Sequence, residues 1–186
     1  MNKVYILDGT DHAIAGLGEA CHQYFVGKGW EADRLVLRES RVSQCLACDG
    51  CAERTIGECV LKDDGSSIAR SSVHCSLFVV MTRVVFGGYS SQLKGGFERT
   101  LPNILPFFTI YKGELHHKLR YQHRPPMLFV GYLDGPDSRQ EHIFHRLALR
   151  SGTNFMVPSA SCVCTGTRAA EELKQQLPRM LEEVKL

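Results

Sequence analysis

Cys75-Ser-Leu-Phe-Val-Val-Met-Thr82 is an almost unbroken apolar run of strand length, and a loop with two adjacent glycines, Gly87 and Gly88, follows it. Such a run is typical of a strand that is buried on both faces. Strands of this kind occur where helices cover both sides of a parallel sheet. The run therefore predicts a central strand of a parallel α/β sheet.

Apolar runs and helical patterns alternate on both sides of this segment. Further strands are predicted at 4–7, 32–37, 127–133 and 156–163, and helices at 14–27, 63–70, 91–101, 138–151 and 167–185. In the helix over 138–151, we expect Ile143, Phe144 and Leu147 to face inward. Five strands alternating with helices predict a parallel sheet with helices on both faces. The sequence has no internal repeat and no linker, so residues 1–186 are expected to form a single domain.

The bulk composition excludes several classes of protein. The chain has 186 residues, of which 44% are hydrophobic, and a net charge of +2, which does not favour a nucleic-acid partner. It lacks the roughly 18 consecutive apolar residues that a membrane span needs. The first apolar run ends at Asp8, too early for a secretory segment, so we expect a cytoplasmic protein with reduced thiols.

A cysteine-rich loop occupies 41–62, and its spacing is Cys-x2-Cys-x2-Cys-x7-Cys, formed by Cys45, Cys48, Cys51 and Cys59. Four thiolates at this density favour a [4Fe–4S] cluster. A tetrahedral zinc site also accepts four thiolates, although zinc more often uses two separated pairs. Unmetallated thiols, a redox pair or a loop retained for assembly would be compatible with the same spacing. Cys21 and Cys75 lie in apolar patterns and are expected in the core.

Ligands of open parallel sheets bind beyond the carboxyl ends of the strands. Three loops leave those ends in the predicted order of elements, at 8–13, 82–91 and 132–136. The first leads into a helix N-terminus, which favours an anion. The second combines bare glycine backbone with apolar neighbours, which suits a flat heterocycle. A long connection at 103–126 is expected to be a functional lid or an interface arm.

The cysteine motif, Asp63-Asp64, the strand at 75–82, Phe86-Gly-Gly-Tyr-Ser-Ser-Gln-Leu-Lys94 and Phe97-Glu-Arg99 together resemble the flavodoxin-like NADPH-dependent FMN reductases, and more narrowly their iron–sulfur flavoprotein branch. The resemblance implies a flavodoxin-like three-layer sandwich with a five-stranded parallel sheet in the order 2-1-3-4-5. It also implies non-covalent FMN, NAD(P)H as cosubstrate, and assembly as a homodimer or homotetramer. The cysteines Cys45, Cys48, Cys51 and Cys59 would be the cluster ligands.

The resemblance also assigns the flavin-binding residues. The FMN phosphate would lie on the first loop, at Gly9, Thr10, Asp11, His12 and Ala13. The isoalloxazine ring would lie against Thr82, Arg83, Val84, Val85, Phe86, Gly87 and Gly88, with Gly131 and Tyr132 approaching from the next strand. No residue is assigned as a catalytic acid or base, because the flavin carries the chemistry.

Two loops depart from the family pattern. The first loop is Gly9-Thr10-Asp11-His12 followed by apolar residues 13–15, where the family has Gly-Ser-Pro-Arg followed by hydroxyl residues, and in the second loop Arg83 replaces a proline. Lys94 and Arg99 lie on an amphipathic helix, where a solvated face is favoured over a nucleotide-phosphate contact.

Three functions follow from these observations. The first is an NAD(P)H-dependent FMN oxidoreductase that reduces a small acceptor, such as a quinone or a disulfide, or an iron–sulfur cluster. The second is an electron carrier between protein partners. The third is a noncatalytic member of the family with weakened FMN binding.

Overall fold

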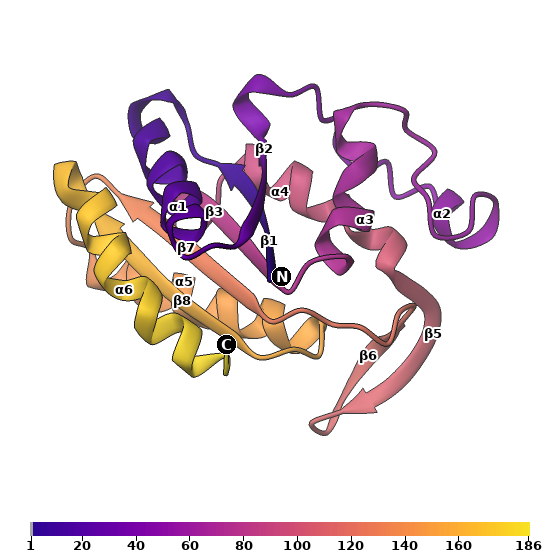
Figure 1. Cartoon of the computed structure of the whole chain (residues 1–186). Coiled ribbons are helices and arrows are strands. Elements are labelled where there is room, and N and C mark those ends of the chain that lie inside the picture. The colour runs from indigo at the N-terminus through magenta and orange to yellow at the C-terminus, as the bar shows by residue number, and fades with distance from the viewer. Residues whose placement is uncertain (1) are drawn as a thin grey trace.

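The computed structural model describes residues 2–186, and a parallel sheet forms its centre (Figure 1). Five parallel strands of the described residues lie in the order β2-β1-β3-β7-β8. Their bounds are β1 Lys3–Gly9, β2 Glu31–Val36, β3 Leu77–Val85, β7 Met127–Leu133 and β8 Ser159–Thr165. This is the predicted order 2-1-3-4-5, with the apolar run of 75–82 at the centre, so the predicted fold class is confirmed.

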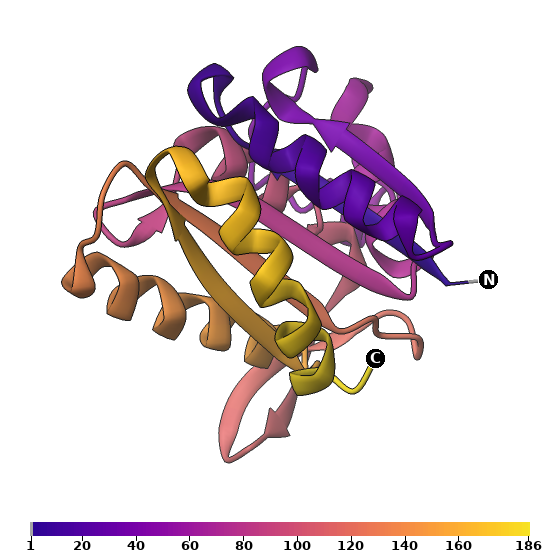
Figure 2. The same ribbon diagram turned by 60° about the vertical axis from the view of Figure 1, so that its left-hand side comes forward.

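Helices cover both faces of the sheet (Figures 1 and 2). One face packs against α1 (Ala15–Gly27) and α6 (Ala169–Glu183), and the other against α3 (Ile68–Val73), α4 (Ser91–Glu98) and α5 (Ser138–Asn154). The two cores share the sheet because successive side chains of each buried strand point to opposite faces. Cys21 and Cys75 are buried, as predicted.

Shorter elements complete the chain. Five 3₁₀ turns span His12–Ile14, Leu37–Glu39, Asp64–Ser67, Leu101–Asn103 and Gly166–Arg168 within residues 2–186. A one-turn helix, α2 (Gly50–Glu53), lies in the cysteine segment, and β4 (Gly88–Tyr89) pairs antiparallel with the end of β3.

The segment 103–126, expected as a long loop, contains a β-hairpin. Its strands are β5 (Ile104–Tyr111) and β6 (Glu114–Leu119), and they form an antiparallel sheet of their own that projects from the body (Figure 1). The connecting residues Lys112 and Gly113 have φ values of 50° and 80°, as a two-residue hairpin turn of type I′ requires. Pro106 and the irregular pairing between Ile104 and Phe108 break the alternation that would reveal a strand.

Two helices differ in detail from the prediction. In α5, Phe144 is buried but Ile143 is 41% exposed, and Ala148 takes the inward position one turn after Phe144. The helix predicted over 91–101 ends at Glu98, and a 3₁₀ turn containing Pro102 follows it. Across residues 2–186, the helices all lack the combination of length and apolar character that crossing a bilayer demands.

Candidate flavin site and cysteine centre

The three loops expected to bind a ligand start from adjacent strands. Gly9 lies opposite Thr82 in the pairing of β1 with β3, and Thr82 lies opposite Gly131 in the pairing of β3 with β7. Arg83 and Tyr132 are the next pair along. The sheet register therefore brings the three predicted loops, at 8–13, 82–91 and 132–136, to one edge of the sheet.

The side chains of Asp11 and Arg83 connect these loops. Asp11 Oδ1 accepts a hydrogen bond from the Ala13 amide at 2.9 Å, and Asp11 Oδ2 lies 2.5 Å from Arg83 Nε. The second nitrogen of the guanidinium, Nη1, lies 2.7 Å from Asp134 Oδ2, and the group stacks 5.2 Å from the centre of the Tyr132 ring. The hydrogen bond from Arg83 lowers the pKa of Asp11, so the carboxylate is an anion held at the start of the 3₁₀ turn His12–Ile14.

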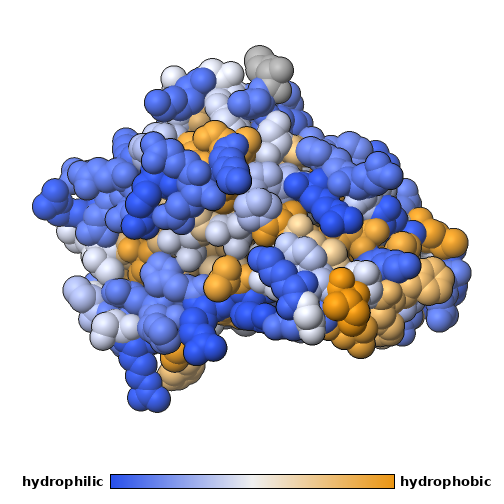
Figure 3. Space-filling model, turned by 90° about the horizontal axis from the view of Figure 1, so that it is seen from below, coloured by the Kyte–Doolittle hydropathy of each residue, from blue (hydrophilic) through white to orange (hydrophobic). Residues whose placement is uncertain are grey.

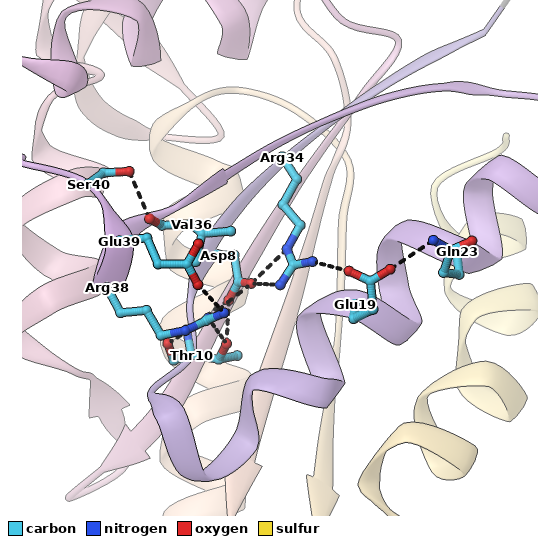
Figure 4. Close-up of polar contacts among 9 residues, drawn as sticks. All are labelled: Asp8, Thr10, Glu19, Gln23, Arg34, Val36, Arg38, Glu39 and Ser40. Carbon is cyan, nitrogen blue, oxygen red and sulfur yellow. Dashed lines mark hydrogen bonds and ion pairs between the residues drawn. The ribbon is translucent and has the colours of Figure 1, made fainter.

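Thr10 faces the interior instead of the loop's open side (Figure 4). Its hydroxyl donates to Asp8 Oδ1 at 2.5 Å and accepts from Arg38 Nη1 at 3.2 Å. Asp8 is fully buried and is held by Arg34, whose Nε and Nη2 lie 2.9 Å and 2.8 Å from Oδ2. The Thr10 hydroxyl is therefore engaged by the protein itself, while His12 and Ala13 remain exposed.

The second predicted loop, at 82–91, exposes two apolar side chains at the end of β3, Val85 and Phe86, and we call this surface the shelf. The Phe86 side chain is 92% exposed, in the left-handed backbone region with φ 51°, and Val85 is 42% exposed. Gly87, with φ 78°, donates its amide to Gln140 Oε1 at 3.2 Å, and any Cβ at this position would meet Ile143. Because α5 holds the glycine in place, the two apolar side chains before it stay at the surface.

The chemistry of this edge matches the two ends of FMN. The exposed surface of Val85 and Phe86 suits a planar aromatic ring. The Asp11 carboxylate lies at the start of the 3₁₀ turn His12–Ile14, bound to the Ala13 amide, with the Arg83 cation beside it. A phosphate that bound at this position would have to displace the Asp11 carboxylate from the Ala13 amide and from Arg83.

The four cysteines of the motif line one cavity of about 340 Å³. The opposite wall comes from the hairpin and the turn before it and consists of Leu101, Ile104, Leu105, Pro106 and His117. The Ala47 amide donates to Cys45 Sγ at 3.5 Å, and Ala47 and Asp49, on either side of Cys48, have φ values of 49° and 53°. Residues other than glycine are strained in the left-handed backbone region, and such strain is often found at functional sites.

The surroundings of Cys51 disfavour its thiolate form. Burial raises the pKa of the Cys51 thiol, and the neighbouring Cys59, Cys45 and Cys48 raise it further. In the described residues 2–186, His, Cys, Asp and Glu side chains do not form a group of three or more arranged to hold a metal ion. The donor set of four thiols around one cavity nevertheless fits a soft metal or a cluster, because a cation removes the mutual repulsion.

Arg99 is buried, which corrects the expectation of a solvated face; Lys94 is exposed. Nη1 of Arg99 donates to Ser43 O at 2.9 Å, and Nη2 lies 2.9 Å from Asp63 Oδ1. Burial lowers the pKa of Arg99, but the hydrogen bond with Asp63 and the nearby Cys59 outweigh it, so the net shift is upward. Asp63 also caps the turn at Asp64–Ser67 by accepting from the Gly65 amide.

An apolar surface lies beside the cysteine cavity. Figure 3 shows apolar side chains gathered on the right of the face seen from below, the side on which Figure 1 places the hairpin and α2. The exposed apolar side chains of the hairpin are Phe107, Phe108, Ile110 and Leu115.

Sequence reasoning located the three loops but missed the polar side chains that organise them. Arg34, Arg38, Asp134 and Gln140 all contact the predicted loops. Of these four residues, Asp134 had a signal in the sequence, because it lies in the third predicted loop. The others come from elements whose approach only the fold reveals.

Known proteins resemble this chain in fold and, over part of its length, in sequence. No family model matches the sequence. The sequence is 30% identical to an iron–sulfur flavoprotein from Methanosarcina thermophila over 74 residues, and 29% identical to one from Methanocaldococcus jannaschii over 75 residues. Each match spans 40% of this chain and 38% of the relative's length.

Solved structures match over nearly the whole chain at low identity. An FMN-dependent NADH-azoreductase from Bacillus anthracis, in complex with FMN, aligns with a TM-score of 0.61 and 13% identity over 96% of this chain and 99% of its own. An NAD(P)H:quinone oxidoreductase from Methanothermobacter marburgensis aligns with a TM-score of 0.66 and 12% identity over 100% of this chain and 99% of its own. A flavodoxin variant from Pseudomonas aeruginosa gives a TM-score of 0.57 at 14% identity, over 99% of both chains. The predicted resemblance is thus confirmed: this chain has a flavodoxin-like fold and is similar to flavin-dependent reductases in structure and to iron–sulfur flavoproteins in sequence.

Proposed function

We propose that this chain is an FMN-binding oxidoreductase that uses NAD(P)H, with residues 1–186 acting as one domain. The observation that carries the proposal is the exposed pair Val85 and Phe86, which leaves the same sheet edge as the Ala13 amide and the Arg83 cation. A planar ring with an anionic tail is the ligand class that this combination suits. The fold that the chain shares with FMN-dependent reductases supports the same ligand.

The residues of the site would bind and orient the cofactor. The Val85–Gly88 backbone and the Phe86 ring would support one face of the flavin, and the Ala13 amide with Arg83 would hold the phosphate. Gly131 keeps β7 close to β3, because a Cβ there would lie 2.7 Å from Val84 Cγ2. FMN, when bound, supplies hydride transfer from NAD(P)H and electron transfer to an acceptor such as a quinone or a disulfide.

We further propose that Cys45, Cys48, Cys51 and Cys59 hold a [4Fe–4S] cluster. Their shared cavity, the Ala47 amide directed at Cys45 Sγ and the sequence similarity to iron–sulfur flavoproteins support this assignment. Clusters of this type are carried by four thiolates and tuned by hydrogen bonds to sulfur.

A second candidate function is electron transfer between proteins. It is favoured by the apolar surface of the hairpin, which borders the cysteine cavity and would bring a redox partner close to the cluster. The same surface supports association of the chain as a homodimer or homotetramer, since large exposed apolar patches mark interfaces.

The visible absorption spectrum of anaerobically purified protein tests both cofactors. We expect flavin bands after incubation with FMN and a broad additional absorption with bound iron. Sustained oxidation of NAD(P)H with a quinone would support the enzyme, whereas flavin reduction without turnover would support the carrier. A protein that stays colourless with FMN and reconstituted iron contradicts the proposal.

A further inference from the structure

The guanidinium of Arg99 contacts both ends of the segment that carries the four cysteines. It contacts the carbonyl of Ser43, two residues before Cys45, and the carboxylate of Asp63, four residues after Cys59. Its Nη2 also lies 3.5 Å from the carbonyl of Leu61. Both ends of the segment are thus fixed to one side chain that comes from the C-terminal end of α4.

Further hydrogen bonds, made by Asp63 and Asp64, join the two ends of the cysteine segment. Asp63 Oδ2 accepts from the Ser43 amide at 2.8 Å, in addition to its contact with Arg99 Nη1 at 3.0 Å. Asp64 Oδ2 accepts from the Arg41 amide at 2.7 Å, and the Asp64 amide donates to Arg41 O at 3.1 Å. The two ends therefore run side by side, and the cysteines occupy the loop that they close.

One nitrogen of Arg99 has no partner. Among the described residues, the buried side-chain polar atoms without a hydrogen bond are Tyr5 Oη, Arg99 Nε and His116 Nε2. Arg99 is 1% exposed, so water does not solvate this N–H group. A buried donor without an acceptor is costly, and a charged donor more so.

We infer that Arg99 is a positioning residue of the cysteine centre: it joins the two ends of the cysteine segment through Ser43 and Asp63, and it leaves a buried Nε–H without a partner beside that segment. The inference rests on the proposed cluster. A cluster with four thiolates carries net negative charge, which a buried guanidinium at the base of the segment stabilises, most strongly in the reduced form. Arg99 therefore raises the reduction potential of the centre.

The test compares reconstituted wild-type protein with Arg99→Lys and Arg99→Gln, and it measures bound iron and the midpoint potential of the cluster. Arg99→Lys keeps a charge but loses the Nε–H and the fork that holds both ends of the segment. We expect a more negative potential in Arg99→Lys, and loss of most of the iron in Arg99→Gln. Circular dichroism verifies that each variant is folded, and Arg99→Lys carries the test if Arg99→Gln does not fold.

Arg120→Lys is the matched control. Arg120 also approaches the cysteine segment, but its contacts go to backbone carbonyls, with Nη2 at 3.5 Å from Cys51 O and Nε at 2.8 Å from Pro102 O. The midpoint potential of the cluster in Arg120→Lys should stay at the wild-type value. Equal potentials and iron contents in wild type and both Arg99 variants overturn the inference and leave the cluster standing. A folded wild type that binds no iron overturns the cluster and the inference together.

Discussion

Arg83 binds Asp11 across the carboxyl edge of the sheet, with Nε 2.5 Å from Oδ2. Both residues belong to the loops in which the sequence departs from the flavin-reductase pattern, and the structure makes them partners. Asp11 alone would repel a phosphate, and Arg83 alone would attract one. If the FMN phosphate binds where we propose, the Asp11 carboxylate of this pair is the anion that it must displace.

Replacing Asp11 by Asn should therefore strengthen FMN binding. The side chain of Asn can still accept the hydrogen bond from the Ala13 amide, so the loop is retained while the competing charge is lost. We expect FMN affinity to rise about tenfold, equivalent to about 1.4 kcal/mol, with riboflavin affinity unchanged. Quenching of flavin fluorescence measures both affinities. Asp134→Asn is the control, because Asp134 contacts the same guanidinium from an exposed position. Equal gains for FMN and riboflavin would show that Asp11 does not occupy the phosphate position.

Replacing Arg83 by Gln should have the opposite effect on the preference for FMN. The phosphate then loses its cation and still meets the Asp11 carboxylate, so we expect FMN affinity to fall about tenfold relative to riboflavin. The same titration, repeated at rising salt, should show a weaker salt dependence in the variant. An unchanged ratio of the two affinities would remove Arg83 from the phosphate site.

The Phe86 ring should contribute to flavin binding and not to folding. It is 92% exposed, so Phe86→Ala should change the free energy of unfolding by no more than about 0.5 kcal/mol. Loss of one aromatic contact should weaken FMN and riboflavin alike, by about 0.5–1.5 kcal/mol. Phe107→Ala, on the hairpin at 64% exposure, is the control and should leave both affinities unchanged. If the two variants bind flavin equally well, the shelf is not the ring site.

Local patterns in the sequence predicted the parallel sheet and the position of the ligand edge, whereas the order of the strands came from the family resemblance. Continuous apolar runs mark strands such as β3 and β7, and strand ends in a parallel sheet meet at one edge. The Arg83–Asp11 pair joins residues 72 positions apart, and an ion pair of that separation leaves no local signal. Arg99 was misassigned for the same reason: its partners Ser43 and Asp63 lie on another segment.

Two glycines of α1 should respond oppositely to alanine. A Cβ on Gly18 would lie 2.0 Å from Asp8 Oδ2, whereas a Cβ on Gly16 has nothing within 4 Å. We expect Gly18→Ala to lower the free energy of unfolding by about 1–3 kcal/mol, because it displaces the buried pair of Asp8 and Arg34. Gly16→Ala should raise it by up to about 1 kcal/mol, since alanine is the better helix former. Denaturant unfolding of the two variants measures both effects, and equal destabilisation would contradict the tight packing at Gly18.

The pair of Asp63 and Arg99 should make stability depend on pH in the acid range. Burial opposes ionisation of Asp63, but the hydrogen bonds from Arg99 and Ser43 lower its pKa to about 2. The pair therefore stabilises the fold above the ordinary aspartate value near 3.9 and loses this contribution as the pH falls through about 2. The difference in free energy of unfolding between wild type and Asp63→Asn should shrink over that interval. A difference that stays constant from pH 6 to about pH 2 would contradict the ionised pair.

The crystal structure of the protein grown with FMN tests the central claim most directly. The account predicts density for the ring against Val85 and Phe86, with the phosphate at the Ala13 amide, Arg83 turned toward it and Asp11 displaced. An intact pair of Arg83 and Asp11, with no flavin at this edge of the sheet, would contradict it.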